Sequence, residues 1–274
     1  MTAALTMRGV RYRYPDTTDY VLDGIDIVVQ PGDWLGIVGA TNAGKSTLCY
    51  AAMGLATEFF HGRLIGEIEV LGTEVRRQKV IERSKRVGML FQNPFTQISG
   101  ARERVDDEVA FGPENHGLEP ALVKARVAEA LQQVGLSELR DRHPLDLSGG
   151  QLQRLALASL LAMHPELLLL DEPTSQLDPA GTKELFAALS RLHAAGVTIV
   201  MVEQKLEAVA ELCGRVVALA KGRILADGTP AQVFNQAAVQ QQVGAPIYAR
   251  LAAGVGLAAP WPVTFETAVR AFNA

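Results

Sequence analysis

Cysteine and histidine are both scarce in this sequence. Only Cys49 and Cys213 occur, and each stands inside an apolar segment, so two reduced thiols in a core are expected rather than a disulfide. This use of cysteine predicts a cytosolic compartment. The five histidines show no metal-ligand spacing, either with one another or with a cysteine. We therefore expect no structural metal site.

Long apolar runs and an excess of basic residues are lacking as well. The longest apolar stretches, among them Leu155–Met163 and Val197–Val202, are far too short to cross a bilayer. The first residues contain arginines but no apolar run after them, so we expect neither a membrane-spanning nor a secreted chain. Lys plus Arg number 26 against 30 acidic residues, which argues against a broad attraction for nucleic acid or anionic lipid. A role at a membrane would therefore need a protein partner.

Apolar material is plentiful, at 48% of the chain, which is enough for one sizeable core with a smaller lobe attached. Strand-like and helix-like segments alternate along it. The predicted elements are strands at 34–38, 87–91, 167–170 and 197–202 and helices at 46–54 and 182–194. This alternation is typical of an α/β fold with a mostly parallel sheet covered by helices on both faces.

Two further helices are predicted between the second and third of these strands. Residues 120–134 keep apolar side chains at helical spacing, and a second amphipathic helix begins at Gly150. We expect a helical lobe at about residues 95–163, inserted into the α/β core. A hairpin at 216–226 follows the core, and residues 229–274 form an Ala-rich, weakly patterned tail.

A glycine-rich segment follows the first predicted strand and precedes a helix. It is Gly39-Ala40-Thr41-Asn42-Ala43-Gly44-Lys45-Ser46, which matches GxxxxGK[ST] in the context where that pattern means a phosphate cradle. Backbone N–H groups would surround the phosphates, Lys45 would neutralise the β and γ groups, and the Ser46 hydroxyl could ligate Mg²⁺. The alternative, a plain strand-to-helix turn, is disfavoured by this context.

Two carboxylates close the apolar strand at 167–170. Asp171 and Glu172 stand at its carboxyl end, where α/β sheets bind ligands. There Asp171 could orient Mg²⁺, commonly through water, and Glu172 could polarise an attacking water. By itself the pattern is weak, because an apolar strand ending in Asp-Glu is as often a strand followed by a helix cap. Its value comes from the phosphate cradle upstream.

The pentapeptide Leu147-Ser148-Gly149-Gly150-Gln151 opens the amphipathic helix of the lobe. Chance would produce it in roughly one such chain in several thousand, which makes it the most specific motif in the sequence. A simple helix start with Ser148 as N-cap explains the same residues. That geometry equally makes an anion site, so the two interpretations agree on structure and differ only on the ligand.

Together these motifs resemble the ATP-binding cassette (ABC) ATPases over about residues 5–235. The segments that carry the resemblance are, in order, Gly39–Thr47, Gln92, Leu147–Gln151, Leu170–Pro173 and Ser175–Asp178. The resemblance implies a P-loop NTPase core with an N-terminal antiparallel β subdomain and an inserted α-helical subdomain, which hydrolyses ATP with Mg²⁺. It further implies a head-to-tail dimer in which the cradle of one copy and the LSGGQ stretch of another enclose each ATP. We place an ABC ATPase domain at 1–235 and a C-terminal helical tail at 236–274.

The same resemblance assigns roles to three residues that the patterns alone do not. Gln92 would contact Mg²⁺ and the attacking water, Asp178 would belong to the loop that crosses the dimer interface, and Tyr14 would stack on adenine. Tyr12 lies two residues away on the same face of a strand, and an ordinary strand tyrosine remains an equal alternative for Tyr14.

The sequence departs from the family pattern at two places. Asn42-Ala43 stand where the family more often has Gly-Ser, but Asn tolerates left-handed backbone angles, so the cradle should survive. After the strand at 197–202, Gln204 occupies the position expected of a histidine that contacts the γ-phosphate. An amide can donate a hydrogen bond there but cannot become cationic, so charge-assisted stabilisation is lost. We predict that hydrolysis is retained, at the same or a lower rate.

A narrower resemblance lies between Gln92 and the pentapeptide. The stretches Gln92–Ile98 and Asp107–Leu118 are similar to the ATPase subunits of energy-coupling factor (ECF) importers, as is the tail. In that family two ATPase subunits, alike or related, grip a transmembrane coupling subunit, and a separate membrane subunit binds a vitamin or a metal ion such as cobalt or nickel. This implies a peripheral place on the cytoplasmic face of the cell membrane and a substrate that this chain does not choose.

The helical lobe is the expected docking surface for the coupling subunit, with residues 92–98 transmitting the motion caused by ATP closure. An equal alternative is that Phe95 and Ile98 are ordinary packing of the lobe.

Two other functions would use the same catalytic residues. A soluble, non-transport ABC ATPase acting on nucleic acid or ribosomes or in cluster assembly is disfavoured by a single cassette without a long coiled-coil insertion or a basic stripe, so no nucleic-acid partner is expected. A purely regulatory nucleotide-binding subunit is disfavoured by intact Lys45, Gln92 and Glu172.

Overall fold

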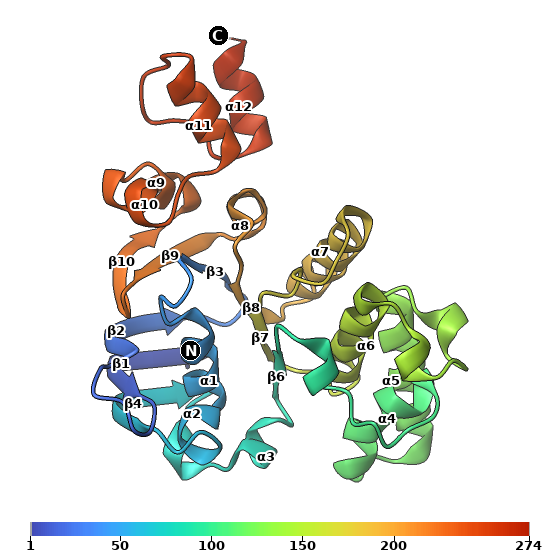
Figure 1. Cartoon of the computed structure of the whole chain (residues 1–274). Coiled ribbons are helices and arrows are strands. Elements are labelled where there is room, and N and C mark those ends of the chain that lie inside the picture. The colour runs from blue at the N-terminus through green and yellow to red at the C-terminus, as the bar shows by residue number, and fades with distance from the viewer. Residues whose placement is uncertain (1, 274) are drawn as a thin grey trace. The chain divides into compact units, whose positions relative to one another are not determined.

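The structure is a computed structural model that describes residues 2–273, and these form two compact units (Figure 1). The first unit contains the chain up to Val80 and from Thr198 onward, and the second contains Ile81–Val197. The expected α/β fold with an antiparallel β subdomain and a helical lobe is confirmed. The predicted lobe at about 95–163 lies wholly within the second unit.

An antiparallel sheet occupies the N-terminal part of the first unit. Its strand order is β2-β1-β4-β5. The strands are β1 (Leu5–Arg13), β2 (Leu22–Val29), β4 (Arg63–Val70) and β5 (Thr73–Glu74). Buried residues alternate with more exposed ones along β2, because successive side chains point to opposite faces and only one face packs on the core. This sheet is the antiparallel subdomain that the family resemblance implied.

A second set of strands in the first unit carries the phosphate-loop segment. It comprises β3 (Trp34–Gly39), β8 (Thr198–Val202), β9 (Arg215–Ala220) and β10 (Arg223–Gly228). β8 and β9 both run parallel to β3, and β10 returns antiparallel to β9 through the predicted hairpin. Every residue of β8 is buried, as expected of a strand covered on both faces.

Short helices pack against the strands of both sets, and α2 and η1 among them contact β4. They are α1 (Lys45–Met53), α2 (Leu55–Glu58), η1 (Val75–Arg77), α8 (Leu206–Leu212) and α9 (Pro230–Phe234). α1 and α8 contact β3, and α9 contacts β9 and β10. α1 ends at a Gly54 C-cap, where the sequence predicted its end.

The C-terminal residues fold into three helices whose bounds the weak pattern did not predict. They are α10 (Ala237–Gln242), α11 (Ile247–Gly254) and α12 (Phe265–Phe272). Two glutamates of α8 hold this tail: the carboxylate of Glu207 accepts from the N–H of Ile247 at 2.8 Å, and that of Glu211 accepts from the N–H of Phe265. Each carboxylate therefore caps the start of a tail helix, where N–H groups lack intrahelical partners. The domain boundary near residue 235 stays a prediction.

The second unit contains two parallel strands and the helical lobe. The strands β6 (Val87–Leu90) and β7 (Leu167–Asp171) are paired, and every residue of both is buried. The other elements are α3 (Val80–Arg83) at its start, η2 (Pro94–Thr96), α4 (Val105–Asn115), α5 (Pro120–Gln133), η3 (Ser137–Leu139), η4 (Pro144–Asp146), α6 (Gly149–Leu161) and α7 (Pro179–Ala194). Helices α4, α5 and α6 contact one another and make up the lobe, green to yellow-green in Figure 1.

The lobe helices at 120–134 and from Gly150 are confirmed as α5 and α6, whereas α4 was not predicted as a helix. Gly112 and Pro113 lie inside α4, and both residue types weaken a helical pattern, which hid this helix. Packing against α5 and α6 supplies the stability that propensity does not.

Burial decides the state of the two cysteines. Cys49 and Cys213 are both buried and form no disulfide. Burial, and after it the Glu203 carboxylate, raises the pKa of the Cys213 thiol far above its ordinary value, so this thiol stays protonated at neutral pH.

Within residues 2–273, no helix has the length and apolar character needed to cross a membrane, and no three His, Cys, Asp or Glu side chains are grouped to hold a metal ion.

Candidate functional site

The phosphate loop joins β3 to α1 in the first unit. Its lysine is ordered by the loop itself: Lys45 Nζ donates to the carbonyls of Gly39 at 2.9 Å and Ala40 at 3.0 Å. A Cβ at Gly39 would lie 2.5 Å from the backbone oxygen of Leu219, and Gly44, the N-cap of α1, has φ of 100°. Glycine is therefore required at both positions by close backbone approach and by left-handed geometry.

The unusual Asn42-Ala43 pair fits this loop. Asn42 has φ of 64°, so it adopts the left-handed conformation that the sequence analysis expected it to tolerate. The N–H of Ala43 donates to the carbonyl of Ala40 at 3.1 Å, and the carbonyl of Ala43 accepts from Gly222 at 3.1 Å. The departure from Gly-Ser thus leaves a closed, hydrogen-bonded turn. Thr41 directly precedes the pair, Ser46 and Thr47 lie in the first turn of α1, and their contacts with the nucleotide stay predictions.

The two candidate tyrosines differ in exposure, Tyr12 lying within β1 and Tyr14 directly after it. Tyr12 is fully buried and donates to the carbonyl of Ala56 at 2.9 Å, and burial raises its pKa to about 12. Tyr14 is only half-buried, with its hydroxyl 3.1 Å from that of Thr47, the residue that follows the cradle. A hollow of about 440 Å³ lies beside Tyr14. Of the two, Tyr14 is therefore the one that borders a hollow, and its stacking on adenine stays a prediction.

A residue that sequence reasoning missed, Glu203, organises the segment between β8 and α8. Its buried carboxylate accepts from the N–H of Gln204 at 2.8 Å and from the N–H of Lys205 at 3.2 Å. These bonds fix the backbone of the exposed Gln204, whose placement at the histidine position of the family stays a prediction. An acidic residue placed directly after a fully apolar strand was the signal that could have identified it.

The second unit brings Gln92 and Glu172 together. Gln92 Nε2 donates to Glu172 Oε2 at 2.7 Å. Asp171 ends β7 and is only 1% exposed, while Glu172 follows it with φ of 46°, an uncommon conformation for a non-glycine residue. The hydroxyl of Ser175 donates to the carbonyl of Gln92 at 3.1 Å, a contact that the sequence analysis did not anticipate. The chain thus holds the amide and the carboxylate in direct contact.

Asp178 is the side chain that starts α7. It accepts from the N–H of Gly181 at 2.6 Å as an N-cap. The alternative interpretation of the Asp171-Glu172 pair as helix caps is therefore wrong, because the cap lies further along the chain. The helix begins at Pro179, earlier than the predicted start at residue 182, because a capped proline start is favourable. A role for Asp178 at a dimer interface stays a prediction.

The LSGGQ segment forms the N-terminus of α6. Ser148 Oγ accepts from the N–H of Gln151 at 3.3 Å, and Gln151 Oε1 accepts from the N–H of Ser148 at 2.9 Å. This reciprocal capping box confirms the predicted helix start. Gly149 and Gly150 supply the first turn without side chains, which leaves the positive end of the helix dipole accessible to an anion.

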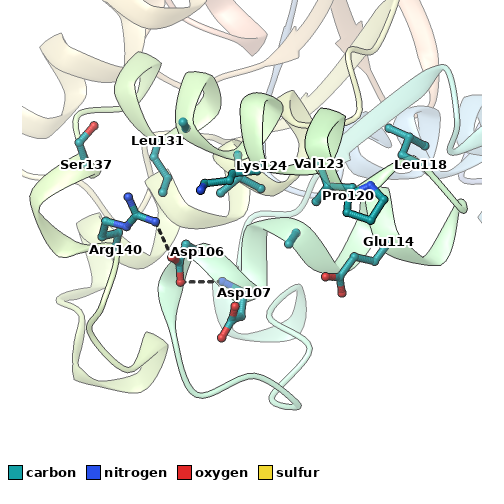
Figure 2. A pocket seen from close by; sticks show the side chains of 13 residues that line it. Asp106, Asp107, Glu114, Leu118, Pro120, Val123, Lys124, Leu131, Ser137 and Arg140 are labelled. Carbon is teal, nitrogen blue, oxygen red and sulfur yellow. Dashed lines mark hydrogen bonds and ion pairs between the residues drawn. The ribbon is translucent and has the colours of Figure 1, made fainter.

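A groove of about 450 Å³ lies in the helical lobe between α4 and α5 (Figure 2). Val123, Val127 and Leu131 of α5 give it an apolar wall, and Asp106 and Arg140 are joined across it at 3.0 Å. Hydrogen bonds from Arg104, and then from Arg140, lower the pKa of Asp106, so this carboxylate stays ionised at neutral pH.

Phe95 lies in η2 ahead of the lobe and is 60% exposed. The interpretation of Phe95 as ordinary packing of the lobe is therefore wrong, whereas Ile98 is half-buried. An exposed aromatic side chain of this size is available for contact with another molecule.

Comparison with known proteins identifies the family. Residues 22–175 match the family model described as "ABC transporter". A putative ABC transporter ATP-binding protein of Methanosarcina mazei is 38% identical over 233 residues, which cover 85% of this chain and 39% of that protein. This chain therefore spans well under half the length of that relative.

Two relatives match over most of their own length. The energy-coupling factor transporter ATP-binding protein EcfA1 of Symbiobacterium thermophilum is 45% identical over 218 residues, covering 79% of this chain and 73% of that protein. The solved structure of cbiO1 from Clostridium perfringens, described as part of the ABC transporter complex cbiONQ, has a TM-score of 0.76 at 30% identity and covers 88% of this chain and 94% of that one. The chain thus belongs to the ABC transporter family, as an ATP-binding protein whose ATPase activity is coupled to transport.

Proposed function

We propose that this chain is the ATP-hydrolysing motor subunit of an ECF-type importer. The observation that carries the proposal is the similarity to EcfA1 at 45% identity over 79% of this chain, together with the similarity to cbiO1 over 88%. In such an importer the chain acts from the cytoplasmic face of the membrane, bound to a transmembrane coupling subunit. The imported substrate is a vitamin or a transition-metal ion, held by a separate membrane subunit.

The contacts of Gln92 and Glu172 support a division of labour in hydrolysis. Glu172 accepts a proton from the attacking water, and Gln92, hydrogen-bonded to it at 2.7 Å, orients that water. Lys45, held by two loop carbonyls, neutralises the β and γ phosphates. No covalent intermediate with the protein is needed, because phosphoryl transfer depends on positioning and charge stabilisation.

The residues present fit Mg²⁺ bound with ATP. Hydroxyl, amide and carboxylate oxygens are ligands that Mg²⁺ accepts, and the assignments remain Ser46, Gln92 and Asp171 as predicted from the sequence. When bound, Mg²⁺ neutralises charge on the phosphate oxygens. Asp171 closes β7 at the carboxyl end of the strand, where α/β sheets bind ligands, and this position favours the assignment.

A second ATPase subunit, identical or paralogous, completes each ATP site. The accessible N-terminus of α6, with Gly149 and Gly150 in its first turn, is an anion site additional to the phosphate loop of the same chain. We assign it to the γ-phosphate of the ATP bound by the partner. Asp178 then belongs to the loop at that interface.

The coupling subunit docks on the helical lobe. The exposed Phe95, three residues after Gln92, and the apolar wall of the groove between α4 and α5 support this assignment, since both offer apolar surface to a partner. Gln204 hydrogen-bonds the γ-phosphate as an amide, which preserves hydrolysis without the cationic contribution of histidine.

A pull-down from solubilised membranes tests the proposal. The full chain carries Glu172→Gln to retain bound ATP, and the co-purifying proteins are identified by mass spectrometry. Recovery of a small transmembrane coupling subunit with a second ATPase is the expected result. Recovery of only soluble, ribosomal or nucleic-acid-binding partners would favour the non-transport alternative and overturn the importer proposal.

A further inference from the structure

Residues 92–99, which we call the strap, connect β6 to the helical lobe. The strap starts at Gln92 and contains η2, whose N-cap Asn93 accepts from the N–H of Phe95 at 3.1 Å. Two side-chain contacts anchor it, one through Gln97 and one through Ser99. Neither Gln97 nor Ser99 belongs to the motifs that carry the resemblance to the ABC ATPases, although Gln97 lies in a stretch that is similar to the ECF importer subunits.

Gln97 anchors the strap to the outer edge of β6. Its Nε2 donates to the carbonyl of Met89 at 3.2 Å, and its Oε1 accepts from the N–H of Phe91 at 3.2 Å. β6 pairs with β7 along its other edge. A primary amide offers one acceptor and a donor in the same arrangement as a peptide group, so the Gln97 side chain takes the place of one residue of a neighbouring strand.

This contact bears directly on Gln92, because Phe91 is the residue before it. The backbone is held on either side of the peptide group between them, by Gln97 on the N–H of Phe91 and by Ser175 on the carbonyl of Gln92. With its backbone held at both positions, the Gln92 side chain is aimed at Glu172, which it meets at 2.7 Å. A shift of about 1 Å in a catalytic group costs rate steeply, so this backbone placement matters for turnover.

Glu108 anchors the far end of the strap to α4. Its carboxylate accepts from the N–H of Ser99 at 2.6 Å and from the Ser99 hydroxyl at 2.7 Å, and the residue is only 4% exposed. A buried carboxylate is costly unless hydrogen-bonded, so these two bonds tie the strap firmly to the lobe.

We propose that Gln97 is a positioning residue for Gln92, and that the Glu108–Ser99 contact makes the position of the strap depend on α4. The inference rests on the proposed roles of Gln92 and Glu172 in hydrolysis.

The test is steady-state ATPase kinetics of the full chain with Mg²⁺ and ATP. Gln97→Met keeps the length of the side chain and removes both hydrogen bonds. We expect kcat to fall about tenfold or more, with KM for ATP unchanged within about twofold, because placement of the reacting groups is lost while ATP binding is kept. Gln132→Met, the same change at an exposed position of α5, serves as the matched control and should leave both constants unchanged.

A double-mutant cycle separates positioning from a general structural effect. In a Gln92→Ala background, Gln97→Met should cause little further loss of kcat, because the two residues act as one unit. If Gln97→Met lowers kcat by the same factor in the Gln92→Ala background as in the parent, the inference is overturned and the proposed function stands. An unchanged kcat in Gln92→Ala alone would overturn the role of Gln92 and the inference with it.

The second anchor has its own pair of variants. Glu108→Gln can keep both contacts with Ser99, since an amide accepts from the N–H and donates to the hydroxyl oxygen, whereas Glu108→Met removes both. We expect Glu108→Gln to retain most of kcat and Glu108→Met to lose it, with KM for ATP unchanged. Equal kcat in the two variants would show that the anchor plays no part in positioning.

Discussion

At the scale of single residues, Glu172 combines an unusual backbone with a precise contact. Its positive φ and its 2.7 Å hydrogen bond to Gln92 place the carboxylate at the end of a fully buried strand. Uncommon backbone geometry that the surrounding structure maintains is a frequent property of functional residues. The carboxylate of Glu172 should therefore affect the rate of ATP hydrolysis more than it affects the binding of ATP.

Replacement of the carboxylate by an amide tests this expectation. In Glu172→Gln we expect kcat for ATP hydrolysis to fall by at least about a hundredfold, because the amide cannot accept a proton, while ATP still binds. Filter binding of labelled ATP and single-turnover hydrolysis measure the two quantities separately. Glu119→Gln, an exposed carboxylate in the lobe, is the control. A variant that loses ATP binding together with turnover would contradict the assigned role.

Gln204 offers a second test at this scale. Its backbone N–H is bonded to Glu203, so the position of the side chain depends on a contact that Gln204→His does not remove. We expect the histidine variant to hydrolyse ATP at least as fast as the parent, because imidazolium can add a charge-assisted hydrogen bond to the γ-phosphate. Rates measured from pH 6 to 8 should favour the variant at the acidic end, where more of the imidazole is protonated. Loss of turnover would count against the placement of Gln204.

At the scale of elements, an ion pair holds together the starts of β6 and β7. Arg86 Nη2 donates to Glu166 at 2.8 Å, and the backbone N–H of Glu166 donates to the carbonyl of Arg86 at 2.8 Å. The Arg86 side chain lowers the pKa of the Glu166 carboxyl below its ordinary value of 4.5. Both side chains are about half exposed, so the pair contributes well under about 1 kcal/mol.

The pH dependence of this contribution follows from the direction of the shift. Because the folded pKa of Glu166 is depressed, the stabilisation is present above the unfolded pKa and is lost as the pH falls through the folded pKa. Arg86→Met should therefore lower the thermal midpoint slightly at pH 7 and progressively less below about pH 4.5. Thermal unfolding of parent and variant at both pH values is the measurement. A difference that stays constant or grows on acidification would show that the ion pair is not its cause.

Helix α8 links the segment of Gln204 to the tail. Glu207 and Glu211 lie one turn apart on this helix and cap the starts of α11 and α12. In Glu211→Ala we expect faster amide hydrogen exchange in α12, because loss of a cap costs about 1 kcal/mol of local stability. Glu211→Gln keeps an acceptor oxygen and should exchange at an intermediate rate. Exchange in α12 that is identical in all three proteins would show that the cap contributes nothing.

At the scale of the whole molecule, the proposed function requires two copies of an ATPase subunit. Lys45 and Ser148 belong to different compact units of one chain, and in a head-to-tail dimer each would serve a different ATP. This arrangement makes a prediction that does not depend on the identity of the membrane partners.

Complementation between two inactive variants tests the composite site. Lys45→Met removes the phosphate contact and Ser148→Arg blocks the start of α6, so each homodimer should be inactive. A mixture in equal amounts should recover about a quarter of the parental rate, because half of randomly assorted dimers are mixed and each of these carries one complete site. The control is the chain that carries both substitutions. A dimer of this chain with either single variant contains no complete site, so these mixtures should stay inactive. Absence of recovery, with mixed dimers demonstrated by differential tagging, would contradict the head-to-tail arrangement.

Much of the fold and of the site was predictable from local sequence. The strand before Gly39, the capped start of α6 at Ser148 and the strand before Asp171 are all contiguous patterns of a few residues. Their conformations follow from spacing, capping and burial within one segment, so the sequence is sufficient to predict them. Helix α4 was missed because Gly112 and Pro113 weaken its local pattern, and contacts with the rest of the lobe decide its conformation.

The sequence by itself determined which chemical groups this protein carries and in what order, because each motif depends on neighbours in the chain. Only the tertiary structure decided how those groups are held. Ser175 contacts Gln92 across 83 positions of sequence, and Glu211 meets Phe265 across 54. The tertiary structure also decided that Tyr12 is buried, that Phe95 is exposed and that the strap is anchored by side-chain hydrogen bonds. Hydrogen bonds and burial between distant segments arise only once the chain is folded, so no local pattern encodes them.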